Sequence, residues 1–473
     1  MATVADERGI AHEARFDPHG IDQIPPEDRT STVLQQFWIW AGANLAPINW
    51  VLGALGIVLG LSLLETLIVV ALGNVVGCAL FGLYCVMGHR TGVNQMVLSR
   101  AAFGRRGAYL PAAGQALMAM GWLGVNTWVV LDLALGVLDE MGYDGGTGTK
   151  YAIGLTLMVL QVLIAIWGFY AIRTFEKYTV PITAALLLVM SILAWTKADV
   201  VWTKSTVSGG DKFTSITQLL TAIGVGWGIT WLTWSSDYAR FIRPGYAARR
   251  VFLGTALGIY IPTVWLAFLG ASIASGGTKA DPSDLVASVF GIMTVPVLFI
   301  IMHGPIATNI LNVYSASLSA LSLDIRTKRW VVSVVAGIVG TISLIAFIQS
   351  ESFAHSFDNW IVSIVVWISA WAGVTFVEFF VIRQGVIDVP QLYEAPERSA
   401  YGDVNWPAIA AMLAGLVAGW AWEFGLVGTF QGPIAKATGN SDFSWAMGLL
   451  VAGLLYYVLV RARRAPRPVP APG

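Results

Sequence analysis

A tryptophan and an asparagine one helical turn apart have the residue types that bind a flat, uncharged ring. Trp122 and Asn126 are four residues apart, so in a helix they lie on one face. An indole offers a planar surface, and a buried amide can donate and accept hydrogen bonds together, as the edge of a nucleobase or an imide requires. The alternative is structural, because polar residues often bond a neighbouring helix in a bundle.

Three further residues could complete such a site. Trp227 lies in the run AIGVGWGITW, where small neighbours would let a planar ligand approach. Asn309 and Asn312 are three residues apart and lie on nearly one face of a later helix. Trp231 and Trp234 follow Trp227, and we expect them to pack rather than to bind.

The stretch QFWIWAGANLAPINWVL, residues 36–52, suggests an ion or substrate site of another kind. Pro47 has no backbone N–H and its ring clashes with the carbonyl four residues back, so the helix should open near Ala43. Bare carbonyls inside an apolar span are tolerated only where they line a cavity or are paired within the protein. A proline kink with a packing role is the alternative interpretation.

Two titratable residues are candidates for proton coupling or gating. His303 could relay protons from inside a span, although a lone histidine is more often hydrogen-bonded in place. Asp237 falls at the inner end of the helix that holds Trp227, where it would be an interfacial ion pair or a gate residue. The other acidic residues expected within spans are Asp132, Glu378 and Glu423, with Glu65 near the outer face. None is level with Trp122 and Asn126, which favours a neutral substrate because a buried unpaired ion is costly.

Membrane-spanning helices must position these side chains. The chain has 473 residues, of which 56% are hydrophobic and 12% charged, and its mean hydropathy is +0.68. A soluble domain carries about twice that charged fraction. Apolar windows of roughly 20 residues, the length of one span, recur twelve times between residues 33 and 461. The sequence therefore predicts an all-α, polytopic membrane protein with about twelve transmembrane helices.

The distribution of lysine and arginine predicts the orientation. If the N-terminus is inside, every arginine faces the cytoplasm, and the basic residues left outside are six lysines: Lys150, Lys197, Lys204, Lys212, Lys279 and Lys436. This positive-inside pattern predicts that both termini are cytoplasmic. We expect the protein to lie in the cytoplasmic (plasma) membrane. We expect residues 1–32 to form a soluble, flexible tail and residues 462–473 to form a Pro/Arg-rich tail.

The first ten helices can be compared as two halves of five, residues 33–196 and 214–382. An odd number of helices in each half would relate the halves by inverted topology. The glycines of AIGVGWGITW weaken the sixth helix at the position equivalent to the break before Pro47. Such paired interruptions indicate a central transport site. Residues 405–461 would add two further helices.

Several other classes of protein lack support in the sequence. The chain has no GxxxxGK[ST] nucleotide-binding run, no spacing typical of a metal site and no basic block of the kind that binds nucleic acid. We therefore expect no enzyme activity, no cofactor and no nucleic-acid partner. The expected surroundings are the lipid bilayer, with the protein a monomer or a weak oligomer.

Four stretches carry a family likeness that covers about residues 20–460. They are GHRTGVNQMVLSRAAFGRRGAYLPA at 88–112, GWLGVN at 121–126, GWGITWLTWSSDYARF at 226–241 and NILNVYSASLSAL at 309–321. The chain resembles the nucleobase-cation-symport-1 family and, within it, the purine and cytosine permease branch. The resemblance implies a five-plus-five inverted repeat of the leucine-transporter type with two added helices. The loop after the second helix should form a short amphipathic helix braced by Arg100.

The resemblance also implies roles for the candidate substrate residues. Trp122 and Trp227 would sandwich the substrate ring. Asn126 matches the asparagine of the purine and cytosine branch, and Asn309 and Asn312 would complete the polar contacts.

A cation site is implied as well, of the kind found in sodium-coupled members. Its ligands would come from Thr308 and from the backbone near Gly42, Ala43 and Ala46. Sodium-coupled members have two adjacent hydroxyls on the eighth helix, whereas Ala307 precedes Thr308 here. This departure favours H+ over Na+ as the coupling ion, with His303 as the nearest titratable group on that helix.

The leading hypothesis is a cation-coupled secondary transporter that imports a neutral nucleobase, cytosine or a purine, by alternating access. An alternative within transport is an importer of allantoin, hydantoin or a vitamin-precursor heterocycle. A third possibility, from another class, is a sensor or scaffold with a transporter fold and no flux.

Overall fold

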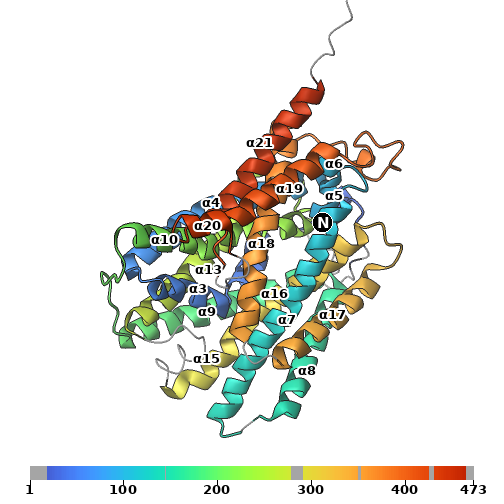
Figure 1. The fold of residues 1–473 in the computed structure, drawn as a ribbon. Coiled ribbons are helices and arrows are strands. Elements are labelled where there is room, and N and C mark those ends of the chain that lie inside the picture. The colour runs from blue at the N-terminus through green and yellow to red at the C-terminus, as the bar shows by residue number, and fades with distance from the viewer. Residues whose placement is uncertain are drawn as a thin grey trace, which may run out of the picture.

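The computed structural model describes residues 17, 19–143, 145–277, 291–349, 353–425 and 431–464, and within these ranges the side chains of all but 353–363 and 463–464. These residues form helices and loops, and their one β-type contact is an isolated parallel bridge between Ser31 and Ile242. The predicted all-α fold is confirmed. Figure 1 shows the N-terminal end beside α5 and α6, with the turn between α7 and α8 at the opposite end of the molecule.

The first span is broken into two helices, α2 (Val33–Asn44) and α3 (Pro47–Val58), whose axes differ by 60°. Thr32 caps the start of α2 in a capping box. The break falls at Leu45 and Ala46, two residues later than the predicted opening near Ala43. Pro47 occupies the first turn of α3, where a missing N–H costs nothing, so the proline starts a new helix instead of bending an old one.

The remaining helices of the first half follow in order after η1 (Pro26–Asp28), which precedes α2. They are α4 (Leu63–Thr91), α5 (Gln95–Leu98), α6 (Arg100–Phe103), α7 (Tyr109–Glu140), α8 (Thr147–Trp167) and α9 (Phe169–Lys197).

The sixth span is interrupted, as its glycines predict. It consists of α10 (Gly209–Leu219), the π-helical η2 (Leu220–Gly224), α11 (Val225–Thr230), η3 (Leu232–Trp234) and α12 (Ser235–Ala239). The Asn74 side chain of α4 donates a hydrogen bond to the Ile223 carbonyl at 2.6 Å, so a carbonyl freed by the interruption is paired inside the protein.

The chain then continues through α13 (Ala248–Ser275), η4 (Gly291–Met293), α15 (Thr294–Ile301), α16 (His303–Leu321), α17 (Arg329–Gln349), α18 (Phe353–Phe376) and the π-helical η5 (Val377–Ile382). The last elements are η6 (Pro390–Leu392), α19 (Trp406–Ala421), α20 (Pro433–Ala437) and α21 (Ser444–Arg464). Figure 1 shows α18, α19 and α21 gathered along one side.

The number of spans agrees closely with the sequence. Within the described part of the chain, ten helices are long and apolar enough to cross a membrane, and the bent pair α2 and α3 brings the number to eleven. The first of the two further helices predicted within residues 405–461 is α19, which is apolar but, at 16 residues, shorter than a full span.

The glycines of the sixth span serve helix packing. A Cβ on Gly228 would lie 2.2 Å from the carbonyl carbon of Gly77 in α4, and a Cβ on Gly226 would lie 1.7 Å from the Thr221 carbonyl oxygen. Side chains at these positions would push α4 and α11 apart or disrupt the π-turn. The expectation that these glycines make room for a ligand is therefore wrong for Gly226 and Gly228.

The N-terminal segment 19–32 is packed against the helices, so the predicted flexible tail is wrong for these residues. The Ile24 side chain is buried, and its N–H donates to the Gly92 carbonyl at 2.9 Å. The Arg29 guanidinium donates to the carbonyls of His89 and Ile242. Residues 1–16 of this tail, and 465–473 of the C-terminal one, lie outside the described residues.

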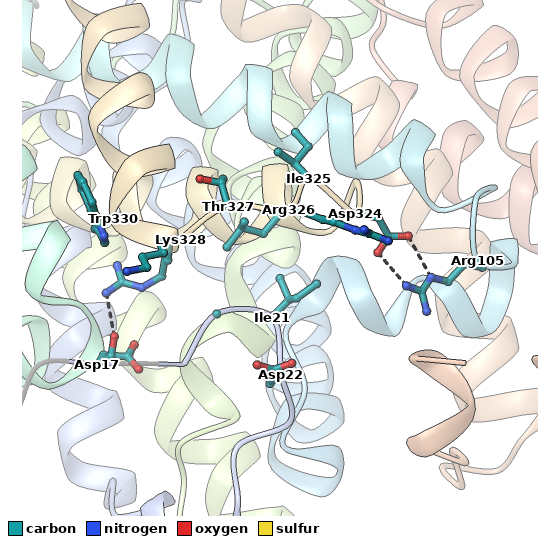
Figure 2. A pocket seen from close by; sticks show the side chains of 13 residues that line it. Asp17, Ile21, Asp22, Arg105, Asp324, Ile325, Arg326, Thr327, Lys328 and Trp330 are labelled. Atoms are coloured by element: carbon teal, nitrogen blue, oxygen red, sulfur yellow. Dashed lines mark hydrogen bonds and ion pairs between the residues drawn. The ribbon is translucent and has the colours of Figure 1, made fainter. Parts of the chain in front are cut away.

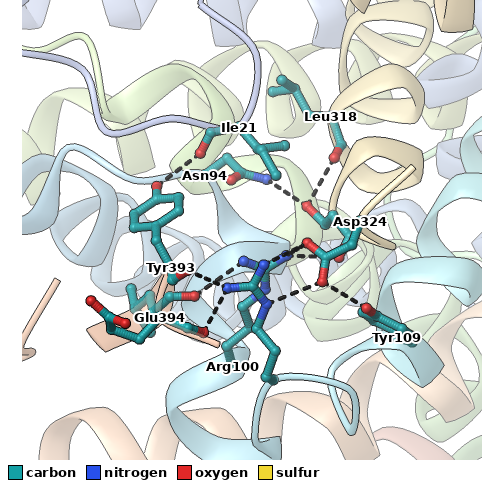
Figure 3. Close-up of polar contacts among 11 residues, drawn as sticks. Ile21, Asn94, Arg100, Tyr109, Leu318, Asp324, Tyr393 and Glu394 are labelled. Atoms are coloured by element: carbon teal, nitrogen blue, oxygen red, sulfur yellow. Dashed lines mark hydrogen bonds and ion pairs between the residues drawn. The ribbon is translucent and has the colours of Figure 1, made fainter. Parts of the chain in front are cut away.

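Arg100 ties several loops together at the end of the molecule where the N-terminal segment packs (Figure 3). We call this end of the molecule the arginine-rich end, because Arg100, Arg105, Arg240 and Arg329 gather there. Arg100 donates to the carbonyls of Ser322 and Leu392 and to the Asp324 carboxylate at 2.9 Å. The predicted brace is confirmed. The predicted amphipathic helix is instead two short helices, α5 and α6, whose residues are all buried.

Asp324 should stabilise the fold in a pH-dependent way. Burial raises the pKa of Asp324, but hydrogen bonds from Arg105 and Tyr109 and the charge of Arg100 lower it by more, so the pKa lies below its usual range. A lowered folded-state pKa gives stability that is complete above the unfolded value of about 3.9 and is lost as the pH falls through the folded value.

We expect Asp324→Asn to cost about 1 to 2 kcal/mol at pH 7, less than a fully buried pair because the Asp324 side chain is 30% exposed. Thermal unfolding of purified protein at neutral and strongly acidic pH measures this. The difference from wild type should shrink at acidic pH, and the exposed Asp139→Asn should show no difference at either pH. An equal difference at both pH values would contradict the assignment.

Candidate functional site

A small cavity lies where the two interrupted spans meet α7 and α16. Its volume is about 30 Å³, far below the roughly 150 Å³ of a cavity that binds benzene. A ring-sized ligand therefore requires the walls to move apart. The lining residues are Ala43, Ile48, Trp122, Asn126, Trp227, Thr230, Trp231, Trp234, Thr308 and Asn312. Six predicted site residues are among them: Ala43, Trp122, Asn126, Trp227, Thr308 and Asn312.

The indole of Trp227 is held by the broken first span. Its Nε1 donates to Asn44 Oδ1 at 2.8 Å, and Thr263 donates to the same oxygen at 3.3 Å. Asn44 itself donates to the Trp40 carbonyl of α2 at 2.8 Å. From the sequence we predict no role for Asn44. Its position as the last residue of α2, three before Pro47, was the available signal.

Four tryptophans face the cavity, not two. Trp231 and Trp234 line it together with Trp122 and Trp227. The ring centroids of Trp231 and Trp234 lie 5.5 Å apart, and Trp227 meets Trp231 edge to face at 6.4 Å. The expectation that Trp231 and Trp234 only pack is therefore incomplete.

Three hydrogen-bond donors of the lining residues have no partner among the described residues. They are Asn126 Nδ2, Trp231 Nε1 and Trp234 Nε1, all buried. The structural alternative for Asn126 was a hydrogen bond from its amide to another helix. Asn126 Nδ2 forms no such bond with a described residue. Buried donors of this kind are normally satisfied, so the cavity wall is suited to a ligand that brings acceptor atoms.

Asn309 does not line the cavity. Its Nδ2 donates to Leu123 O at 3.1 Å, Thr127 Oγ1 at 2.9 Å and Gln161 Oε1 at 2.8 Å, which ties α16 to α7 and α8. Its Oδ1 accepts from Asn312 Nδ2 at 3.4 Å. In this form of the protein Asn309 positions Asn312, and only Asn312 is brought to the cavity.

The predicted cation residues meet at the break. Thr308 Oγ1 donates to the Ala43 carbonyl at 2.9 Å and to the Gly304 carbonyl at 3.0 Å. A Cβ on Gly304 would lie 2.2 Å from the Leu45 carbonyl oxygen and 2.6 Å from the Ala46 Cα, so α16 touches the broken segment directly.

The other predicted cation residues add few free oxygens. The Ala46 carbonyl accepts from the Asn49 N–H at 3.0 Å. Gly42 lies outside the cavity lining, and the buried Ala307 adds no side-chain oxygen. Within the described residues, no group of three His, Cys, Asp or Glu side chains could hold a metal ion.

His303 and Asp237 lie outside the cavity. His303 Nε2 is hydrogen-bonded to Thr179 Oγ1 of α9 at 2.7 Å, and its ring stacks on Phe175. The Asp237 carboxylate accepts the Gln95 N–H at 3.0 Å and forms no ion pair with another described residue, so the ion-pair interpretation is wrong. The gate interpretation stays a prediction.

A larger cleft of about 860 Å³ opens at the arginine-rich end, between the N-terminal segment and residues 324–330 (Figure 2). Its walls carry Asp17, Asp22, Arg105, Asp324 and Arg329, among others. Charged walls do not suit a neutral ring, because the ligand would displace water that the charges bind. The smaller aromatic cavity therefore remains the candidate site.

A closing layer of Tyr238, Arg240 and Tyr314, all fully buried, follows Trp234 toward this cleft. Arg240 Nη2 donates to Tyr314 Oη at 2.8 Å, and Tyr314 Oη donates to Asp17 Oδ2 at 3.0 Å. The layer ties the sixth span and α16 to the N-terminal segment. The cavity is thus closed toward the arginine-rich end.

Interrupted helices that meet at an aromatic cavity within a bundle of spans define a secondary transporter of the inverted-repeat class. Residues 23–448 match the family described as permease for cytosine/purines, uracil, thiamine, allantoin, and the chain belongs to this family. It is a permease, not an enzyme. The resemblance to nucleobase-cation-symport-1 proteins is confirmed.

Known proteins of similar sequence or fold cover nearly the whole chain. A putative purine-cytosine permease of Bacillus subtilis is 25% identical and aligns over 94% of this chain and 95% of its own length. A vitamin B6 transporter of Saccharomyces cerevisiae is 26% identical over 82% of this chain and 69% of its own. A solved nucleobase-cation-symport-1 transporter, closed with bromovinylhydantoin bound, has a TM-score of 0.75 at 19% identity, covering 94% of this chain and 95% of that one.

Proposed function

We propose that the protein imports a neutral nucleobase, cytosine or a purine, across the cytoplasmic membrane by alternating access coupled to a cation. The observation that carries this proposal is the cavity wall, which is lined by four tryptophans and includes three buried donors that have no partner among the described residues. Nucleobases offer flat faces for stacking and ring nitrogens or carbonyl oxygens as acceptors. Among the described residues, no ionisable side chain lines the cavity, which suits an uncharged ligand.

The roles of the lining residues follow from their positions. Trp227 and Trp122 would hold the ring faces, with the Trp227 indole oriented by Asn44. Asn126 and Asn312 would bond the ring edge, and Asn309 would keep Asn312 in place. Trp231 and Trp234 would close the site on the side of the closing layer.

Release requires the closing layer to separate. We propose that the arginine-rich end and both termini face the cytoplasm, in agreement with the positive-inside rule. The two repeats, 33–196 and 214–382, would move relative to each other around the interrupted helices, with 405–461 as an addition at the side. Nothing in this cycle requires more than one copy of the chain, so we propose a monomer or a weak oligomer.

We propose a proton rather than sodium as the coupling ion. A sodium ion binds only where oxygens replace its hydration shell. Here the Thr308 hydroxyl lies within hydrogen-bond distance of the Ala43 and Gly304 carbonyls, to either of which it can donate, and Ala307 adds no oxygen. The predicted cation position is therefore poor in free oxygen ligands.

The proposal is tested by ligand binding and by flux. The melting temperature of purified protein should rise with cytosine, adenine, hypoxanthine or uracil, because a ligand of the folded state stabilises it. The same compound should enter proteoliposomes. A response to allantoin, hydantoin or pyridoxine alone would favour the second candidate, for which the family description and the vitamin B6 relative speak. Binding without uptake would indicate a sensor.

A further inference from the structure

A carboxyl group that the sequence did not single out is buried beside the broken first span. Glu176 of α9 is fully buried, and neither of its carboxyl oxygens has a hydrogen-bond partner among the described residues. It also forms no ion pair there with a basic side chain. A fully buried acid with both oxygens unpartnered is rare, and inside a membrane protein it indicates a functional site.

The carboxyl fills the place of a side chain at Gly42. A Cβ built on Gly42 would lie 2.0 Å from Glu176 Oε2 and 2.9 Å from its Cδ. Gly42 is followed directly by Ala43, whose carbonyl accepts from Thr308 and which lines the cavity. The acid therefore packs on the same turn of α2 that borders the candidate substrate site.

The titratable groups near Glu176 leave the carboxyl without a counter-charge. Of the helices packed against α9, α2 and α15 contain no titratable residue. On α16, His303 is bonded to Thr179, one turn from Glu176, and Tyr314 is bonded to Arg240 and Asp17. Tyr238 of α12 donates its hydroxyl to the Leu311 carbonyl and forms no hydrogen bond with Glu176.

The cations of the surrounding helices form no hydrogen bond with the Glu176 carboxyl. On α9 itself, Arg173 donates to Thr30 and Lys177 lies over the Tyr178 ring. The remaining titratable residues of the packed helices are Lys150 and Tyr151 on α8, and Arg249, Arg250 and Tyr260 on α13. None of these forms a hydrogen bond with the Glu176 carboxyl.

We propose that Glu176 carries the proton that is co-transported with the substrate, an inference that rests on the proposed function. An ionised carboxylate without a partner cannot remain in this closed form at reasonable cost, so the closed form holds Glu176 as the neutral acid. When the arginine-rich end opens, water reaches the carboxyl and takes its proton, which leaves the carboxylate and a hydrated proton.

Coupling then follows from the position of Gly42. The empty protein returns to the outward-open form with Glu176 ionised and hydrated, and the turn of α2 at Gly42 and Ala43 is not packed on the carboxylate during this return. A proton taken up from the outer side then neutralises the carboxyl and lets the turn pack back, so the closed, substrate-holding form carries one proton inward with the substrate. His303 becomes a positioning residue for α9 through Thr179 instead of the proton carrier.

The test separates coupling from binding in proteoliposomes. The probe is the radiolabelled compound that gives the largest thermal shift in the ligand panel. For Glu176→Gln, which resembles the neutral acid, we expect equilibrium counterflow to remain and accumulation driven by an inward pH gradient to be lost. The control Glu423→Gln changes a buried carboxyl just beyond α19 and should keep both activities.

A conservative variant distinguishes a loss of coupling from misfolding. Glu176→Asp keeps an acid and should accumulate the probe with a displaced pH profile. Gradient-driven accumulation by Glu176→Gln would overturn the proposal, as would an unchanged pH profile of Glu176→Asp. Accumulation by wild type that requires sodium and ignores the pH gradient would overturn it too. Absence of counterflow in wild type would instead contradict the proposed function. Failure of the Glu176 proposal and failure of the proposed function are therefore distinguishable.

Discussion

Replacing Asn126 by leucine should weaken substrate binding at least roughly thirtyfold. The amide is expected to satisfy two positions on the ring edge, and each buried group left unpaired costs about 1 to 3 kcal/mol, or about 2 to 6 kcal/mol together. Asn126 Nδ2 has no partner in the described part of the chain, so its removal should not lower the melting temperature of the unliganded protein. Calorimetric titration and thermal unfolding measure the two quantities.

Asn309→Leu is the matched control. Its Nδ2 bonds partners on α7 and α8, so the change should lower the melting temperature, unlike Asn126→Leu. The interpretation fails if Asn126→Leu binds with wild-type affinity, or if it destabilises the free protein as much as Asn309→Leu does.

Trp227→Ala should weaken binding by about 2 to 4 kcal/mol, because it removes a stacking surface worth about 1 to 3 kcal/mol and the anchoring bond to Asn44. Trp227→Phe keeps a ring and loses only the bond, so about 1 kcal/mol is expected. Asn44→Ala should resemble Trp227→Phe. Trp406→Ala, at a position that is 67% exposed, should have no effect on affinity.

A double-mutant cycle sharpens this prediction. If the bond from Trp227 to Asn44 orients the ring, Trp227→Phe and Asn44→Ala should be less than additive when combined. Additive effects would mean that Asn44 acts through α3 and not through the indole. Equal losses in Trp227→Ala and Trp227→Phe would show that stacking contributes little.

Local chemistry made the two interruptions predictable. Pro47 cannot continue a helix, and the glycine run of the sixth span cannot resist a π-turn, so both breaks follow from the residues themselves. We predicted the break before Pro47 two residues too early. The prediction used the carbonyl that would clash with the proline ring, near Ala43, whereas the chain avoids the clash by starting α3 at the proline.

Contacts between distant segments were beyond the sequence. Asn309 and Asn312 share a helix face, yet only the packing of α7 and α8 decides which of the two amides is hydrogen-bonded to neighbouring helices. Glu176 stands in the run RTFEKY between two basic residues, where it resembles an ordinary helix-surface acid. Its burial depends on the crossing of α9 over α2, which no local pattern encodes.

The size of the cavity has a consequence for affinity. Because the cavity of about 30 Å³ is too small for a ring, we expect the ring-binding arrangement to be a minor population of the unliganded ensemble. The apparent dissociation constant is then the intrinsic one divided by the competent fraction, so a fraction of about 1% weakens binding about a hundredfold. Substitutions far from the ring that enlarge this fraction should tighten binding without adding a single contact to the ligand.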